Sequence, residues 1–297
     1  MTNYQNVSAR AMLVNLHIST WTARKFDRRV SEQVTDDAKA DRNAGRYNKH
    51  LLAGAAAHAD VLKRAMRARA KHYSQTLPWG DESRLLPTAN YFAYTEAMRQ
   101  ERAAFDRALV NFVDEYPALR DQAPVKLGAL YSPNEFPDVR TVARRFDWVI
   151  DFSPVPSGCD IRLDLPADQI AEIERSVEER VERVTREAMA DAWRRLSEAV
   201  VRIQKAAAPG GVVRGSLIDH ARDVVDVLGR LNVGEDADLD AMRDRVLREL
   251  TTIAPEDLRT DDRLRADTAT RAENIIATMG AFYAPSSPDA VDAIAAA

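Results

Sequence analysis

The sequence contains few residues of the kinds that build disulfide and metal sites. Cys159 is the one cysteine among 297 residues, which excludes an internal disulfide framework and any zinc site made of several cysteines. The five histidines form no HExxH motif and no pair four residues apart, so the sequence predicts no metal centre. No run approaches 18 consecutive apolar residues, and the N-terminal segment lacks the apolar stretch of a signal peptide. We therefore expect a cytoplasmic protein with no bound cofactor and no membrane contact.

Signatures of catalysis are missing as well. Gly210-Gly211 has no GxxxxGK[ST] or GxGxxG motif around it, and no serine lies in a nucleophile-elbow context. Four aspartates occur in or beside a predicted β-hairpin, at Asp147, Asp151, Asp160 and Asp164. The apolar residues between them alternate regularly, so we expect these carboxylates to face water. An enzyme that uses dispersed acidic residues stays open as a hypothesis, but the sequence favours a non-enzymatic protein.

The longest continuous pattern predicts one helix of about 40 residues, from Pro166 to Ala207 (166–207). No glycine or internal proline interrupts it, and Pro209-Gly210-Gly211 ends it. At 1.5 Å per residue the helix is roughly 60 Å long, about as wide as a compact domain of this size or wider. From Met189 onward its apolar residues cover a broad face, which predicts burial.

The first half of this helix has only a narrow apolar stripe, with Glu and Arg residues on either side. Its members are spaced three and four residues apart: Ile170, Ile173, Val177, Val181 and Val184. Such a stripe is typical of a coiled coil. It predicts either a helix covered by the rest of the same chain or self-association through the stripe.

Charge is distributed unevenly along the chain. Residues 1–75 carry 14 Lys/Arg and 6 Asp/Glu, whereas residues 209–297 carry 10 Arg and 17 Asp/Glu. No lysine follows Lys205. An electropositive N-terminal part and an electronegative C-terminal part either bind different partners or bind each other in neighbouring copies.

Residues 46–73 predict a helix with an apolar side and a basic side. The apolar side is expected to contain Leu52, Ala55, Ala59, Leu62, Met66 and Tyr73. The basic side, with Arg42 just before it, is expected to contain Arg46, Lys49, Arg64, Arg67 and Lys71. A basic helix binds the phosphates of DNA or RNA, binds the acidic face of a protein partner, or faces only water. No motif for reading bases accompanies it, so any nucleic-acid binding is expected to be non-specific.

The remaining patterns complete a mainly α fold with a small antiparallel β-sheet, of the α+β class. Alternation predicts a strand over 13–20 and a β-hairpin over 145–165, with its second strand at Ile161–Leu165, directly before the long helix. Leu77–Asp81 is expected to form a turn. Helices are expected over 21–39, over 89–116 with a stop at Pro117, and in three segments after residue 209.

These elements suggest four regions along the chain. They are a flexible lead at 1–12, an α+β core at 13–208, an acidic helical bundle at 209–283 and a disordered tail at 284–297. The acidic bundle is expected to fold back on the broad face of the long helix.

Several segments resemble an uncharacterised family of bacteriophage and prophage proteins. They are Thr76-Leu-Pro-Trp-Gly-Asp, Arg84-Leu-Leu-Pro-Thr-Ala-Asn-Tyr, Phe112-Val-Asp-Glu-Tyr-Pro-Ala-Leu and Phe152-Ser-Pro-Val-Pro. The resemblance extends over residues 13–283. It implies a phage genome and a bacterial host cytoplasm, and it assigns no catalytic residues. Similar genes occur beside MoxR-like AAA+ ATPases, which implies an adaptor or substrate of such a machine.

Together, these observations lead us to expect a phage-encoded, non-enzymatic structural or adaptor protein that self-assembles into a homo-oligomer through the long helix. One alternative is a non-specific nucleic-acid-binding protein that uses the basic segment 42–75. A second alternative is an adaptor of an AAA+ ATPase.

Overall fold

The structure is a computed structural model that describes residues 7–80, 83–157 and 166–282 of the chain. These residues are mainly helical with a small antiparallel sheet, which confirms the predicted α+β class. The chain divides into two compact units. Unit 1 comprises residues 1–15, 73–94 and 151–297, and unit 2 comprises residues 16–72 and 95–150. Four elements contribute residues to both units: β1 (Ala11–Ser19), α3 (Ala56–Ser74), α4 (Tyr91–Leu127) and β6 (Asp147–Pro154).

A four-stranded sheet has the strand order β4-β5-β1-β6. Strand β4 (Leu77–Trp79) pairs antiparallel with β5 (Ser83–Pro87), and β5 pairs antiparallel with β1. The strand predicted over 13–20 is therefore confirmed. The turn predicted over Leu77–Asp81 is wrong at its start, because Leu77 and Trp79 are buried sheet residues. Gly80, at φ +59°, begins the bend after them, and Asp81 lies outside the described residues. The second strand of the predicted hairpin, Ile161–Leu165, lies outside the described residues.

The N-terminal segment is more ordered than its sequence predicts. Val7–Arg10 form the short helix α1, and Ala11 and Met12 already belong to β1. Val7 is 2% exposed, so burial of this side chain holds the segment in place. The expected flexible lead is thus wrong for residues 7–12. The expected tail at 284–297 lies outside the described residues.

The long helix of the sequence prediction is α6 (Ala167–Ala207). It begins directly after Pro166 with Asp168 in its first turn, where an acidic side chain suits the positive end of the helix dipole. Three further helices follow the Pro209-Gly210-Gly211 break, as predicted, together with the four-residue helix α9 (Asp257–Thr260). They are α7 (Leu217–Leu231), α8 (Ala237–Glu249) and α10 (Asp262–Phe282).

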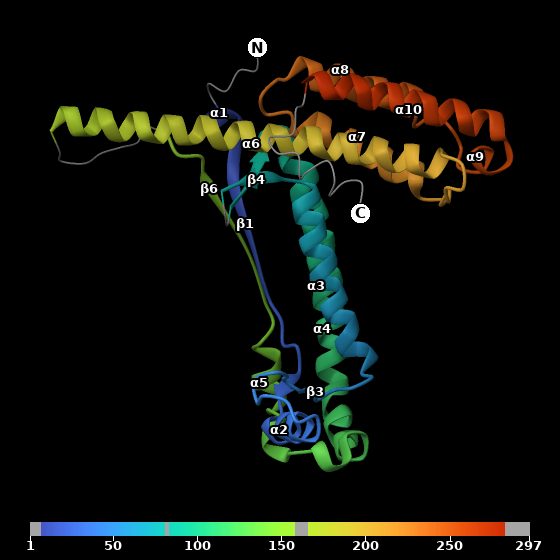
Figure 1. Cartoon of the computed structure of the whole chain (residues 1–297). Helices are drawn as coiled ribbons and strands as arrows, with labels where there is room; N and C mark the ends of the chain where they lie inside the picture. The colour runs from blue at the N-terminus through green and yellow to red at the C-terminus, as the bar shows by residue number, and fades with distance from the viewer. Residues whose placement is uncertain (1–6, 81–82, 158–165, 283–297) are drawn as a thin grey trace. The chain divides into compact units, whose positions relative to one another are not determined.

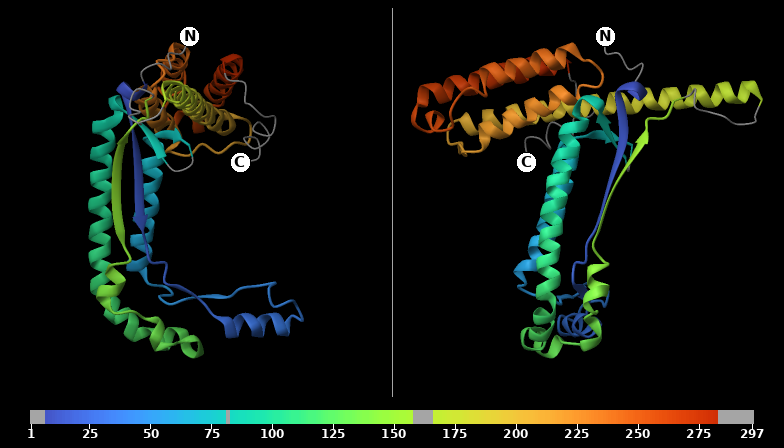
Figure 2. Two further views of the ribbon diagram at one scale, coloured as in Figure 1. Left: turned by 90° about the vertical axis from the view of Figure 1, so that its left-hand side faces the viewer. Right: turned by 180° about the vertical axis from the view of Figure 1, so that it is seen from behind.

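These C-terminal helices pack against the second half of α6 (Figures 1 and 2). Leu196, Val200 and Ile203 are fully buried in the core that they share, with Ile218, Leu228 and Ile275 from the helices opposite. The Trp193 indole nitrogen donates a hydrogen bond to Asp236 Oδ2 at 2.9 Å, and Asp236 also caps the start of α8. The predicted folding back of these helices onto the broad face of α6 is confirmed.

Unit 2 is built around aromatic side chains. The helix α4 contributes Phe112 and Tyr116, whose rings meet Trp21 and Phe146 at centroid distances of 5.7–5.9 Å. His58 from α3 lies 5.1 Å from Phe112 and 6.0 Å from Trp21. The His58–Phe112 pair is tilted and the other pairs are edge-to-face, and such contacts stabilise the core beyond the burial of the rings.

The smaller elements of unit 2 complete this packing. They are β2 (Arg24–Phe26), α2 (Arg28–Asp37), β3 (Asn48–His50), α5 (Val139–Ala143) and two 3-10 turns, η2 (Gly128–Leu130) and η3 (Pro133–Glu135). A further 3-10 turn in unit 1, η1 (Thr88–Asn90), leads into α4. The single helix predicted over 21–39 is wrong in its first third, because Arg24–Phe26 pair with β3 and Asp27 caps the helix that follows.

Helix α4 also continues beyond its predicted stop. Pro117 and Pro124 both lie inside the helix. Pro117 is exposed, whereas the neighbouring Tyr116 is fully buried and donates a hydrogen bond to the Pro137 carbonyl at 2.8 Å. Tertiary packing therefore maintains the helix through a residue that removes one backbone hydrogen bond. Within the described part of the chain, no helix combines the length and apolar character needed to cross a membrane.

We predict that His58 makes the stability of the protein depend on pH. Its Nε2 lies 2.7 Å from the Trp21 carbonyl in the buried aromatic core, and burial lowers the pKa of the imidazole below its ordinary value of 6.5. A lowered pKa means that the folded state binds fewer protons than the unfolded state, so the stabilisation is complete above pH 6.5 and is lost as the pH falls through the folded-state pKa.

Thermal unfolding between pH 7.5 and 5 should show this loss in the wild type and a weaker dependence in His58→Gln. His17→Gln removes an exposed imidazole instead and should retain the wild-type profile. An unchanged pH dependence in His58→Gln would contradict the assignment.

Candidate functional site

The five residues of the α6 stripe, which we call the α6 seam, lie where the core of unit 1 ends. Val184 is 6% exposed and belongs to that core, and Val181 packs against its edge. Ile170, Ile173 and Val177 are half-buried and lie outside the core cluster of the described residues. The seam is thus continuous with a face that packs on helices of the same chain.

The residues between the seam positions explain why the first half of α6 does not join this core. Glu178, Glu179, Arg180, Glu182 and Arg183 are all exposed. Burying this many charges without partners costs far more free energy than the few apolar residues of the seam recover. The narrow apolar width of the seam therefore suits contact with one helix rather than insertion into a core.

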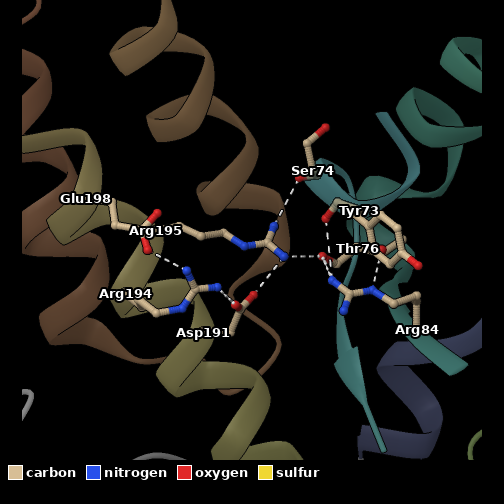
Figure 3. A network of polar contacts seen from close by, with 8 residues as sticks. All are labelled: Tyr73, Ser74, Thr76, Arg84, Asp191, Arg194, Arg195 and Glu198. Carbon is tan, nitrogen blue, oxygen red and sulfur yellow. Dashed lines mark hydrogen bonds and ion pairs between the residues drawn. The ribbon is translucent and has the colours of Figure 1, made fainter. Parts of the chain in front are cut away.

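A polar network fixes α6 to the end of α3 and to β4 within unit 1 (Figure 3). Arg195 on α6 donates to the Ser74 carbonyl at 3.2 Å and to the Thr76 carbonyl at 2.8 Å. Asp191, one turn earlier, lies 2.7 Å from Arg195 and also pairs with Arg194. Thr76 directly precedes β4, so its bond to Arg195 determines which side of α6 faces the sheet.

Arg84 on β5 completes this network from the opposite side. Its guanidinium donates to the Thr76 hydroxyl at 3.1 Å and to the Thr76 carbonyl at 3.0 Å, and lies 5.0 Å from the centre of the Tyr73 ring. Burial lowers the pKa of Arg84 to about 10, with the positive charge of Arg195 as a further cause. Arg84 stays protonated at neutral pH, and its donors are used to hold backbone and hydroxyl oxygens.

The basic residues predicted to lie along one helix do not share an element. Helix α3 begins at Ala56, so Arg42, Arg46 and Lys49 precede it, and Lys49 lies in β3. Of the predicted apolar side, Leu52 and Ala55 are buried but precede α3, and the members on α3 itself are mostly not buried. Ala59, Met66 and Tyr73 are exposed, whereas Val61, Ala65, Ala68 and His72 are buried. Small alanines at these positions allow a close approach to other parts of unit 2, which hydrophobicity alone does not reveal.

Lys49 is a structural residue. Its side chain is 6% exposed, and its Nζ lies 3.1 Å from Asp27 and 2.8 Å from Glu135. It also donates to the Leu130 carbonyl at 2.8 Å. Burial alone lowers the pKa of Lys49, but hydrogen bonds to Glu135 and Asp27 outweigh that effect and raise it. The ammonium is therefore charged, paired and withdrawn from solvent.

The arginines that the sequence singled out on α3 form ion pairs within the protein. Arg64 pairs with Asp60 at 3.2 Å, and Arg67 pairs with Glu101 at 3.0 Å. Lys71 is half-buried. The face that the sequence singled out thus contains ion pairs, which reduces its attraction for a polyanion.

A second basic surface lies on the two-stranded ribbon of β2 and β3. We call it the basic ribbon and define it by four exposed cations, Arg24, Lys25, Arg29 and Arg46. Sequence reasoning missed three of them because residues 21–39 were read as one helix. The local composition could have indicated this surface, since four of the six residues from Arg24 to Arg29 are Lys or Arg.

The described residues show no arrangement for metal chemistry. No group of three or more His, Cys, Asp and Glu in residues 7–80, 83–157 and 166–282 is placed to hold a metal ion. Asp147 and Asp151, considered above for catalysis, are both exposed, and Asp160 and Asp164 lie outside the described residues. Comparisons with protein-family models, with curated proteins and with solved structures found no match to this chain.

We predict that Lys49→Ala destabilises unit 2 by about 3 kcal/mol or more, because removing one partner leaves two largely buried carboxylates unpaired. The matched control is Lys25→Ala, which removes the exposed lysine opposite Lys49 in the ribbon register and should change the free energy of unfolding by less than about 0.5 kcal/mol. Urea denaturation of the two variants measures both values. Equal effects would show that Lys49 has no special structural role.

Proposed function

We propose that this protein is a non-enzymatic, self-assembling structural or adaptor protein whose copies join through the α6 seam. The supporting observation is the continuity of the seam with the core face of α6. Val184 and the apolar residues of that face after it are covered by the same chain, whereas Ile170, Ile173 and Val177 lie outside that core. A half-exposed apolar stripe between charged shoulders suits a helix of the same kind.

Within this proposal, two copies of α6 run antiparallel. In a parallel pair the second halves of both helices would lie side by side, and the helices α7, α8 and α10 already cover that face. In an antiparallel pair the two covered halves point away from each other, so only the first halves meet. Steric exclusion therefore favours the antiparallel arrangement.

The spacing of the seam fits an antiparallel pair. The steps between its five residues are three, four, four and three, which read the same in both directions. If two copies cross at Val177, Ile173 of one lies level with Val181 of the other. Ile170 then lies beside Val184, where the core of the second copy begins. The overlap is about 20 residues and roughly 30 Å long, so we expect an affinity in the micromolar range.

Opposite net charges add attraction between copies. Unit 1 carries 21 Lys/Arg and 31 Asp/Glu, whereas unit 2 carries 21 Lys/Arg and 15 Asp/Glu. Unit 1 of one copy thus attracts unit 2 of another, and salt weakens this long-range term. A phage setting and an adaptor role beside an AAA+ ATPase rest on the family resemblance alone, and an assembled form of the protein would serve either.

We predict that the wild type exceeds its monomer mass in light scattering at tens of micromolar, and that Val177→Glu lowers the association constant at least tenfold by placing a charge in the seam. Ser176→Glu is the matched control, because it adds the same charge at the preceding position, outside the seam, where the side chain is exposed. A wild type that stays monomeric at every salt concentration would contradict the proposal.

Disulfide cross-linking tests the direction of the pair. In a Cys159→Ser background, mixing Ile173→Cys with Val181→Cys should give a cross-linked heterodimer, and each variant alone should cross-link poorly. A parallel pair in register would give the reverse pattern. This result would overturn the antiparallel arrangement while leaving self-association intact.

A further inference from the structure

The backbone that carries the basic ribbon is fixed by strand pairing and hydrogen bonds. Arg24 lies opposite His50 and Phe26 opposite Asn48 in the antiparallel register. The Asp27 amide donates to the Tyr47 carbonyl at 3.0 Å, and the Tyr47 amide donates to the Ser31 hydroxyl at 2.9 Å. These bonds connect the ribbon to the first turn of α2, so the positions of its cations are set by folded backbone.

Buried ion pairs beneath the ribbon hold it from inside. Lys49 in β3 binds Asp27, which precedes α2, and Glu135 on η3. Asp27 also accepts the Val30 amide at 3.1 Å, and this bond, followed by the contact with Lys49, lowers the pKa of Asp27. Asp27 is therefore engaged mainly by the Val30 amide and Lys49, and its attraction to Arg29 is the smallest of these contributions.

The four cations that define the ribbon take part in no ion pair among the residues described by the structure. The neighbouring Arg28, in contrast, pairs with Glu32 at 2.9 Å. An exposed group of unpaired cations on rigid backbone attracts a polyanion, since binding releases the counterions of the polyanion and requires little ordering of the protein.

Two partly exposed aromatic residues directly follow two of these cations in the sequence, Phe26 after Lys25 and Tyr47 after Arg46. Phe26 is 40% exposed and Tyr47 is 39% exposed. The Arg46 guanidinium lies 4.7 Å from the centre of the Phe26 ring. Aromatic rings beside cations provide stacking surfaces for unpaired bases, whereas an acidic protein surface would use the cations alone. The combination favours nucleic acid with exposed bases over a duplex or an acidic protein.

We propose that the basic ribbon binds single-stranded nucleic acid without sequence preference. Arg24 and Arg46 contact phosphates on the ribbon face of Phe26, while Lys25 on the opposite face and Arg29 on α2 contact phosphates where the strand passes around the ribbon. Phe26 and Tyr47 stack on bases. This site differs from the basic helix predicted from the sequence, since Lys49 is buried in ion pairs and Arg64 and Arg67 of α3 are paired with carboxylates.

Fluorescence anisotropy with a labelled 30-nucleotide oligo(dT) tests the proposal on the full chain. Four phosphate contacts predict a slope of log K against log salt of about −2.8, so affinity should fall about 50-fold between 50 and 200 mM salt. The double variant Arg24→Ala/Lys25→Ala should show a slope of about −1.4 and a fall of only about sevenfold. Phe26→Ala should weaken binding about fivefold or more with an unchanged slope.

The control is the double variant Lys63→Ala/Arg64→Ala, which removes two cations from α3 and should bind as the wild type does. Thermal unfolding should show that all variants remain folded, because the removed ribbon side chains are exposed. Three outcomes would overturn the proposal: no binding at 50 mM salt, an equal loss in the α3 variant, or tighter binding to duplex than to single strand. If the wild type binds no oligonucleotide and Arg24→Ala/Lys25→Ala loses self-association, the partner of the ribbon is instead the acidic unit 1 of a second copy.

Discussion

Burial of only one half of α6 is the constraint on which the rest of unit 1 depends. From Val184 onward the helix supplies one wall of the core, and α7, α8 and α10 supply the others. The Arg195 network fixes the rotation of α6 against β4, so the orientation of the uncovered half is not adjustable. The position of Ile170, Ile173 and Val177 outside the core is therefore a consequence of how the buried half packs.

The sequence allowed prediction of features that depend on local pattern. An uninterrupted apolar stripe and a Pro-Gly-Gly break defined α6 within one residue at its start, and alternation located β1. The errors arose where contacts with residues distant in the sequence determine whether a side chain is buried or a helix continues. Lys49 looks like a surface cation until Asp27 and Glu135 are seen beside it, and Pro117 stays helical because Tyr116 is anchored by tertiary contacts.

The two candidate surfaces differ in chemistry and belong to different units. The α6 seam is apolar and narrow, and the basic ribbon is cationic and partly aromatic. Self-association through the seam would give each assembly two ribbons, and a strand long enough to reach both would bind more tightly than one ribbon allows. Self-association would thus strengthen strand binding. The two proposals depend on different residues, so an experiment can contradict one and leave the other intact.

Amide hydrogen exchange at two protein concentrations tests the central claim most directly. If copies join along the α6 seam, protection of residues 167–183 should rise with concentration, while residues 184–207 are protected equally at both because their own chain covers them. Exchange in 167–183 that is the same at both concentrations would contradict assembly through the seam.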